Sequence, residues 1–223
     1  MLAIAALSFY AFPIDLKYND QRGNIMRATL LSAAALALAL GACAPAAPAS
    51  PQDQFFANLT ALCGQSFAGQ VVTTDAQDAD FASQPLVMEV RECSDSVIRV
   101  PFHVGEDHSR TWVITRTAEG LRLKHDHRHE DGSEDVLTQY GGDTANEGSV
   151  TRQEFPVDQF SKDLFIAQDI PQSTTNVWAV EVQPAAFFAY ELARENRHLR
   201  VEFDLRAPVA APPPPWGAEP AAN

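Results

Sequence analysis

Three histidines at alternate positions, His125, His127 and His129, form the most distinctive chemical pattern of the chain. Side chains of one parity on a strand point to one face, so all three imidazoles are expected on the same side. Leu121 and Leu123 precede them with the same parity, which makes that side inward or rim-facing. Imidazole nitrogens bind zinc, manganese or iron(II), and a nearby carboxylate would complete such a site.

The residues after the histidines suggest where that carboxylate lies. Asp131-Gly132 suits the central positions of a type I′ hairpin turn, and this turn places His129 opposite Glu134. His127, His129 and Glu134 then converge into a candidate divalent-metal site. His125 is a weaker candidate ligand, since it would lie about 13 Å from His129 along a straight strand. The same register pairs Arg128 with Asp135, His127 with Val136, His125 with Thr138, and Leu123 with Tyr140.

The histidines have two further interpretations. Polar side chains at a hairpin tip are commonly solvated without any ligand. Imidazoles that are neutral at pH 7 would then only reduce the density of negative charge on a rim rich in acidic residues. A cluster of imidazoles can also respond to pH, because the ordinary pKa of histidine is near 6.5.

A family resemblance covers the same segment. His127-x-His129, four residues, Glu134, six residues and then Gly141 resembles the first metal motif of cupins, which implies metal ligation by the two histidines and the glutamate. Gly120, however, lies one residue too far from His127 for this motif. The second cupin motif, with its Pro-x-Gly and a further histidine, is not visible.

Other catalytic signatures are missing from the sequence, which has no Gly-x-Ser-x-Gly elbow, phosphate loop or dinucleotide fingerprint. We therefore assign no catalytic residue, and the sequence favours a non-enzymatic protein. Aromatic side chains at inward strand positions could line a ligand pocket, although such residues also serve as plain core. The candidates are Trp112, Trp178, Phe188 and Tyr190.

Residues 26 to 43 have the layout of a bacterial export signal. Met26-Arg27 supplies a basic start, and residues 28 to 40 form an apolar run shorter than the roughly 20 residues of a transmembrane helix. Leu40-Gly41-Ala42-Cys43 follows and resembles the lipobox of bacterial lipoproteins. The resemblance implies cleavage before Cys43 and a lipid anchor on that cysteine.

The residues on either side of this signal refine the prediction. Residues 1 to 25 combine an apolar start with a charged patch that no signal peptide accommodates, so we expect translation to begin at Met26. A genuine N-terminal extension is the alternative. Ala44 follows the cysteine, and by resemblance to enterobacterial lipoproteins it favours the outer membrane, with the domain facing the periplasm.

Charge and cysteine content agree with an exported protein. The chain has 16 Lys and Arg against 29 Asp and Glu, a net charge of −13, which argues against nucleic acid as a partner. With Cys43 assigned to lipid, Cys63 and Cys93 form an even pair in an oxidising compartment, which predicts a disulfide. Two buried free thiols are the alternative.

The remaining pattern predicts an all-β domain. Apolar residues alternate along short segments, most clearly in residues 199 to 205, and such regularly spaced strands predict a single antiparallel barrel of nine or ten strands. Its architecture resembles that of lipocalins. The other expected strands lie near residues 67–73, 86–90, 98–104, 112–114, 121–129, 136–140, 149–155, 178–182 and 188–192.

Two short helices accompany the strands. Ser50, Pro51 and Asp53 have the spacing of a capping box, and apolar residues at helical spacing follow until Gly64. A second helix is expected over residues 158 to 167, capped by Asp158, with Phe160 and Leu164 on one face. The predicted organisation is an extension (1–25), a signal peptide (26–42), a lipidated tether (43–50), the barrel (51–206) and a Pro-rich disordered tail (207–223).

Together these features predict a lipid-anchored envelope protein that binds a small ligand or a divalent metal. A metalloenzyme that activates water at His127, His129 and Glu134 is one alternative. A structural envelope protein without a ligand is the other. A ligand-binding barrel requires an apolar cavity, an enzyme requires an open metal site in a cleft, and a structural protein requires neither.

Overall fold

The computed structural model describes residues 49 to 218 of the chain. The predicted extension, signal peptide and Cys43, with the tether to residue 48, lie outside the described residues, as do residues 219 to 223. Within the described range, no helix combines the length and the apolarity needed to cross a membrane.

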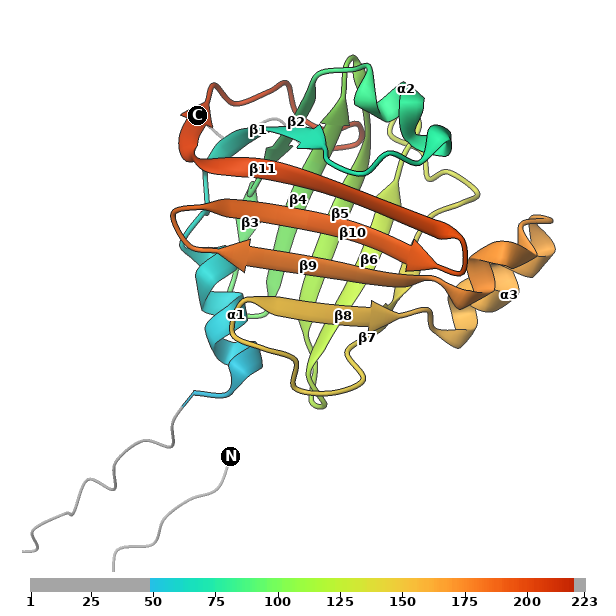
Figure 1. Cartoon of the computed structure of the whole chain (residues 1–223), viewed down its shortest axis with the longest axis horizontal. Helices are drawn as coiled ribbons and strands as arrows, with labels where there is room; N and C mark the ends of the chain where they lie inside the picture. The colour runs from blue at the N-terminus through green and yellow to red at the C-terminus, as the bar shows by residue number, and fades with distance from the viewer. Residues whose placement is uncertain (1–48, 219–223) are drawn as a thin grey trace, which may run out of the picture. The chain divides into compact units, whose positions relative to one another are not determined.

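One antiparallel sheet curls into a nearly closed barrel of ten strands, as Figure 1 shows. The strands are β1 (Ser66–Val71), β2 (Leu86–Glu89), β4 (Val97–Val104), β5 (Asp107–Arg116), β6 (Leu121–His127), β7 (Tyr140–Asp143), β8 (Arg152–Pro156), β9 (Val177–Gln183), β10 (Phe187–Arg194) and β11 (Arg197–Val209). They follow the order β7-β6-β5-β4-β2-β1-β11-β10-β9-β8, and the short β3 (Glu92–Cys93) pairs with β4. The predicted all-β fold, a single antiparallel barrel, is confirmed.

The seam between β7 and β8 closes the barrel without a full ladder. The Asp158 N–H, just after β8, donates to the Gly141 carbonyl at 2.9 Å. A Cβ at Gly142 would lie only 1.8 Å from the Pro156 carbonyl oxygen, so the close approach of the two backbones requires glycine there.

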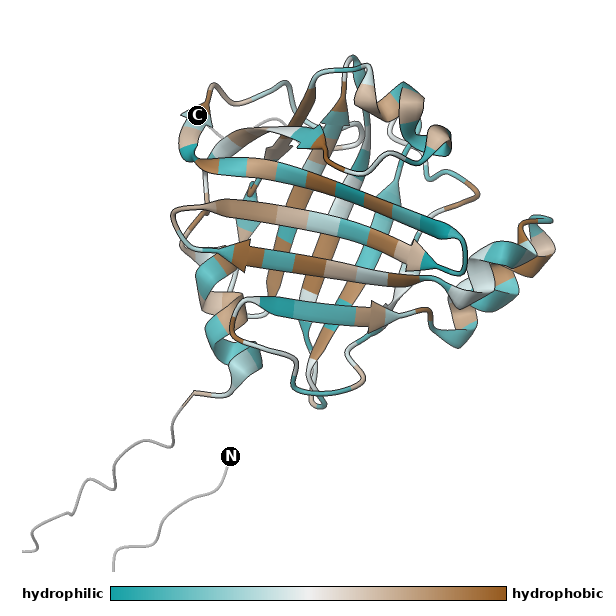
Figure 2. Cartoon of the chain, in the orientation of Figure 1, coloured by the Kyte–Doolittle hydropathy of each residue, from teal (hydrophilic) through white to brown (hydrophobic). Residues whose placement is uncertain are grey.

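Hydrophobic and hydrophilic residues alternate along many of the strands (Figure 2), and the apolar side chains pack together inside the barrel. Phe102, Trp112, Phe188 and Phe203 meet in the middle, with ring centroids 4.8 Å apart for Phe102 and Trp112 and 5.8 Å apart for Phe188 and Phe203. All four side chains are buried. Stacked and edge-to-face rings at these distances pack a dense apolar core.

Helices cover the two ends of the barrel. Helix α1 (Pro51–Thr60) has the predicted capping box between Ser50 and Asp53, and its apolar face buries Phe55 and Leu59. It ends at Thr60, earlier than the apolar spacing predicts, and a turn leads to Gly64. At the opposite end lie α2 (Ala79–Ala82), the 3₁₀ turns η1 (Ala76–Asp78) and η2 (Pro171–Thr175), and α3 (Gln159–Ala167).

Helix α3 confirms the predicted cap but buries a different face. The Asp158 side chain accepts from the Ser161 N–H. Ser161 and Phe165 point into the protein, whereas Phe160 is 56% exposed. The reason is the seam, because the Gly141 N–H donates to Ser161 Oγ at 2.7 Å and fixes which side of the helix faces the barrel.

A disulfide joins Cys63, after α1, to Cys93 in β3, so this prediction is confirmed. The bridge ties the helix that covers one end of the barrel to the sheet. It closes a segment with a sequence separation of 30 residues.

Replacing both cysteines, Cys63→Ser/Cys93→Ser, should lower the free energy of unfolding by about 3 to 4 kcal/mol, because the unfolded chain regains the entropy that this loop closure removes. Denaturant unfolding measures the change. A reductant should destabilise the wild type by a similar amount and leave the double variant unaffected. Equal stability of oxidised wild type and variant would contradict a stabilising role for the bridge.

Candidate functional site

A pocket of about 230 Å³ opens at the end of the barrel away from α1, between α3, η2 and the ends of β6, β9 and β10. We call it the mouth pocket. Its apolar lining comes from Leu137, Phe165, Ile170, Trp178 and Leu192. Its polar lining comes from His127, Tyr140, Ser173, Asn176, Tyr190 and Arg194.

A network of histidines and tyrosines lies beside this pocket. The His125 ring is 2% exposed, and its Nδ1 lies 3.1 Å from the Tyr140 carbonyl oxygen. Because a carbonyl only accepts, Nδ1 carries the proton, and Nε2 accepts from the Tyr190 hydroxyl at 2.7 Å. The Tyr140 ring stacks on His125 with centroids 4.5 Å apart, and its hydroxyl lies 3.3 Å from His127 Nε2.

Burial keeps this network neutral. Loss of hydration lowers the pKa of His125 to about 3. Burial, reinforced by the positive charge of Arg110, lowers the pKa of His127 to about 4. The same burial raises the pKa of the Tyr140 and Tyr190 hydroxyls. At neutral pH the network therefore offers hydrogen bonds without charge.

The hairpin after β6 differs from its predicted form. His129 and Ser133 are joined by a backbone hydrogen bond, and the Asp131 side chain accepts from the Ser133 N–H at 2.9 Å, so the turn is wider than two residues. The register shifts by one residue as a result, and Arg128 pairs with Glu134 in place of His129. Beyond the irregular residues 135 to 139 the offset is two residues in the opposite direction, so that His125 pairs with Tyr140 and not with Thr138, and Leu123 with Gly142.

In this register His129 no longer lies opposite Glu134, as the predicted metal site required. His129 and Glu134 are exposed, and Glu134 Oε1 accepts from Arg128 at 3.4 Å. His125 has both ring nitrogens occupied by tyrosine groups. Across residues 49 to 218, no group of three or more His, Cys, Asp or Glu side chains has metal-binding geometry.

Two of the four predicted pocket aromatics, Trp178 and Tyr190, line the mouth pocket. Trp112 and Phe188 lie deeper, in the filled core, where Trp112 stacks on Tyr190 with centroids 4.4 Å apart. Sequence analysis missed Arg194. This residue lies four positions after Tyr190 on β10, so the two side chains point to the same side of the sheet.

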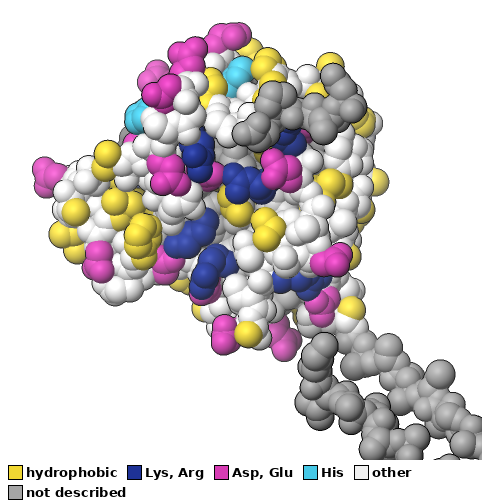
Figure 3. All heavy atoms as spheres, turned by 180° about the vertical axis from the view of Figure 1, so that it is seen from behind, with side chains coloured by type: hydrophobic (Ala, Val, Ile, Leu, Met, Phe, Trp, Pro, Cys, Tyr) yellow, Lys and Arg dark blue, Asp and Glu magenta, His cyan; other side chains and the backbone are white. Residues whose placement is uncertain are grey.

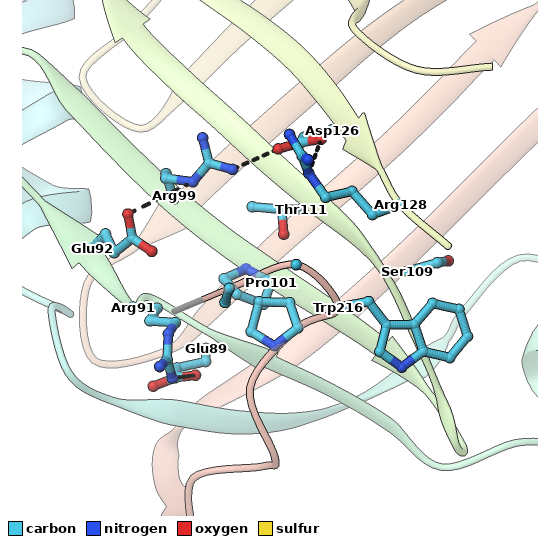
Figure 4. A pocket seen from close by; sticks show the side chains of 13 residues that line it. Glu89, Arg91, Glu92, Arg99, Pro101, Ser109, Thr111, Asp126, Arg128 and Trp216 are labelled. Atoms are coloured by element: carbon cyan, nitrogen blue, oxygen red, sulfur yellow. Dashed lines mark hydrogen bonds and ion pairs between the residues drawn. The ribbon is translucent and has the colours of Figure 1, made fainter. Parts of the chain in front are cut away.

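A larger hollow, of about 620 Å³, lies on the outer face of β4, β5 and β6 (Figures 3 and 4). We call it the outer groove. Its three arginines are neutralised within it. Arg91 pairs with Glu89 at 3.2 Å, while Arg99 and Arg128 share the buried Asp126 at 2.6 and 3.1 Å.

The C-terminal segment forms one wall of the outer groove. Residues 207 to 209 extend β11 instead of belonging to the tail, and residues 215 to 218 lie against the groove. The Trp216 N–H donates to the His108 carbonyl at 3.0 Å. Gly217 has a φ of +76°, and a Cβ there would lie 2.6 Å from Arg128 Cδ, so this contact requires glycine. The predicted disordered tail therefore includes residues that contact the barrel.

The two hollows differ in what they offer a ligand. The outer groove is polar and charge-paired, whereas the mouth pocket combines apolar rings with neutral hydrogen-bonding groups.

No family model, curated protein or solved structure matches this chain.

The buried His125 should make stability depend on pH. Its folded pKa of about 3 lies below the unfolded value of 6.5, so its contribution is complete above pH 6.5 and is lost as the pH falls. When the pH falls from 6.5 to about 5, the free energy of unfolding of the wild type should drop. The drop in His125→Gln should be about 1.5 kcal/mol smaller, because the variant has no imidazole to protonate on unfolding. Denaturant unfolding at several pH values measures this.

The exposed His129→Gln is the matched control, and its loss of stability with pH should equal that of the wild type. If His125→Gln also followed the wild-type curve, His125 would take up its proton inside the folded barrel, and the predicted coupling would be wrong.

Proposed function

We propose that this protein binds a small, largely apolar ligand in the mouth pocket, as a lipid-anchored protein of the bacterial envelope. One observation supports the binding role above all: an open, aromatic-lined pocket at the end of an otherwise filled barrel. Concave apolar sites with a few fixed polar groups are the usual form of small-molecule sites, and barrel mouths are a common place for them. The volume of about 230 Å³ suits a ligand of one or two rings.

The chemistry of the lining favours binding over catalysis. A general base works best when its pKa is near the operating pH. With pKa values of about 3 and 4, His125 and His127 are poor bases at neutral pH. Their nitrogens hold the Tyr190 and Tyr140 hydroxyls in place, which orients the rings that a ligand would contact.

The lipid anchor is supported by the lipobox resemblance at residues 40 to 43. The Cys63–Cys93 disulfide fits the same proposal, because such bonds persist in oxidising compartments outside the cytosol. Helix α1 begins at Pro51, so only a short tether would separate the lipid from the barrel.

Neutral aromatic probes, indole and 2-phenylacetamide, should bind the purified domain. Trp178→Leu should weaken their binding at least tenfold, because the pocket wall loses the buried ring against which His125 and Tyr140 pack. Calorimetry measures the affinities. Trp216→Phe, which changes a tryptophan of the outer groove, is the matched control and should bind as the wild type does. If Trp178→Leu bound the probes as well as the wild type does, the mouth pocket would not be their binding site.

The anchor has a separate test. In a bacterial host fed a labelled fatty acid, the full chain should incorporate label and fractionate with membranes. Cys43→Ser should do neither, because the thiol that accepts the lipid is gone. Cys63→Ser/Cys93→Ser, which removes the other two cysteines, should still be labelled. Label on the Cys43→Ser chain would show that the anchor is elsewhere.

A further inference from the structure

We infer that the ligand of the mouth pocket carries a carboxylate and that Arg194 binds it. This inference rests on the proposed binding function and names the chemical class of the ligand. It starts from a guanidinium that faces an aromatic pocket without an acidic partner.

Arg194 is the last residue of β10 and the one permanently charged group of the pocket lining. Its Nη1 donates to Asn176 Oδ1 at 3.1 Å. A guanidinium has five N–H donors, so most of its hydrogen-bonding capacity is left over. Asn176 is itself buried, which fixes the position of the guanidinium at the rim of the pocket.

The absence of a carboxylate partner sets Arg194 apart. Every other arginine among residues 49 to 218 has an Asp or Glu oxygen within 4.0 Å. Asp75, whose negative charge acts on Arg194, pairs with Arg197 at 3.2 Å. Burial and the neighbouring Arg197 both lower the pKa of Arg194, as expected for a guanidinium without a carboxylate at contact distance.

The other arginines at this end of the barrel are paired, and Asp135 is a carboxylate whose charge acts on the pocket lining. Arg110 is paired with Asp107 at 2.6 Å, and Arg197 is paired with Asp75 and Asp78. Asp135 lies near enough to His127 to oppose the lowering of its pKa, and its carboxylate accepts from the Leu137 N–H. An anion that enters the pocket therefore meets one free guanidinium, and its own charge would replace the missing partner.

The lining defines the rest of the ligand. Phe165, Trp178 and Leu192 offer an apolar surface beside the guanidinium, which suits a ring or a short branched chain. A single planar guanidinium matches the two oxygens of a carboxylate, whereas a phosphate dianion usually attracts several cations. The pocket therefore fits a small aromatic or branched aliphatic carboxylic acid.

Three ligands of nearly equal shape test the inference: phenylacetate, 2-phenylacetamide and 2-phenylethylammonium, with charges of −1, 0 and +1. Calorimetry at neutral pH should find phenylacetate bound at least tenfold more tightly than the amide, and the cation more weakly than both. Arg194→Gln, which keeps a donor for Asn176, should bind acid and amide with equal affinity. Arg194→Lys should restore part of the preference for the acid.

Arg122→Gln is the matched control, since it removes an arginine that pairs with Asp143 elsewhere in the barrel. It should keep the full preference for phenylacetate. Equal binding of acid and amide by the wild type, or an unchanged preference in Arg194→Gln, would overturn the inference and leave the proposed function standing. Failure of all three ligands and of indole to bind the wild type would overturn both.

Discussion

The hydrogen bond from the Asp158 N–H to the Gly141 carbonyl marks the place where the sheet closes on itself, and the mouth pocket depends on that closure. Gly142 permits the approach because any side chain there would collide with the opposite backbone. One residue before the seam, Tyr140 stacks on His125 at the pocket. Directly after it, α3 starts and carries Phe165 into the lining. Two walls of the site are therefore positioned by one backbone contact.

Closure also explains why the hollow lies at the end of the barrel and not in its middle. A barrel of this size has an interior that side chains can fill, and a cluster of buried apolar residues with four aromatic rings at its centre fills it here. The packed rings form a rigid floor under Tyr190, whose hydroxyl then holds the His125 imidazole. Because the imidazole is buried, protonation would strand a charge in an apolar region, so the network stays neutral.

Much of the fold could be predicted from local patterns. Alternating apolar residues located most strands within a few positions, and the caps at Ser50 and Asp158 located two helices. The hairpin could not be predicted, because the Asp131 side chain accepts from Ser133 and widens the turn, and because residues 135 to 139 interrupt the ladder before β7. The buried face of α3 depends on a contact with the distant Gly141, which no local pattern contains.

The candidate site was predictable to the extent that it follows strand parity. Trp178 and Tyr190 were found in this way, and the same rule extended by two strand positions reaches Arg194. What parity cannot show is whether a charge has a partner. In a chain with a net charge of −13, the outer groove supplies carboxylates to all three of its arginines, so an arginine that lacks one is the exception. The guanidinium of Arg194 therefore offers an anion in the mouth pocket the partner that the chain itself does not supply.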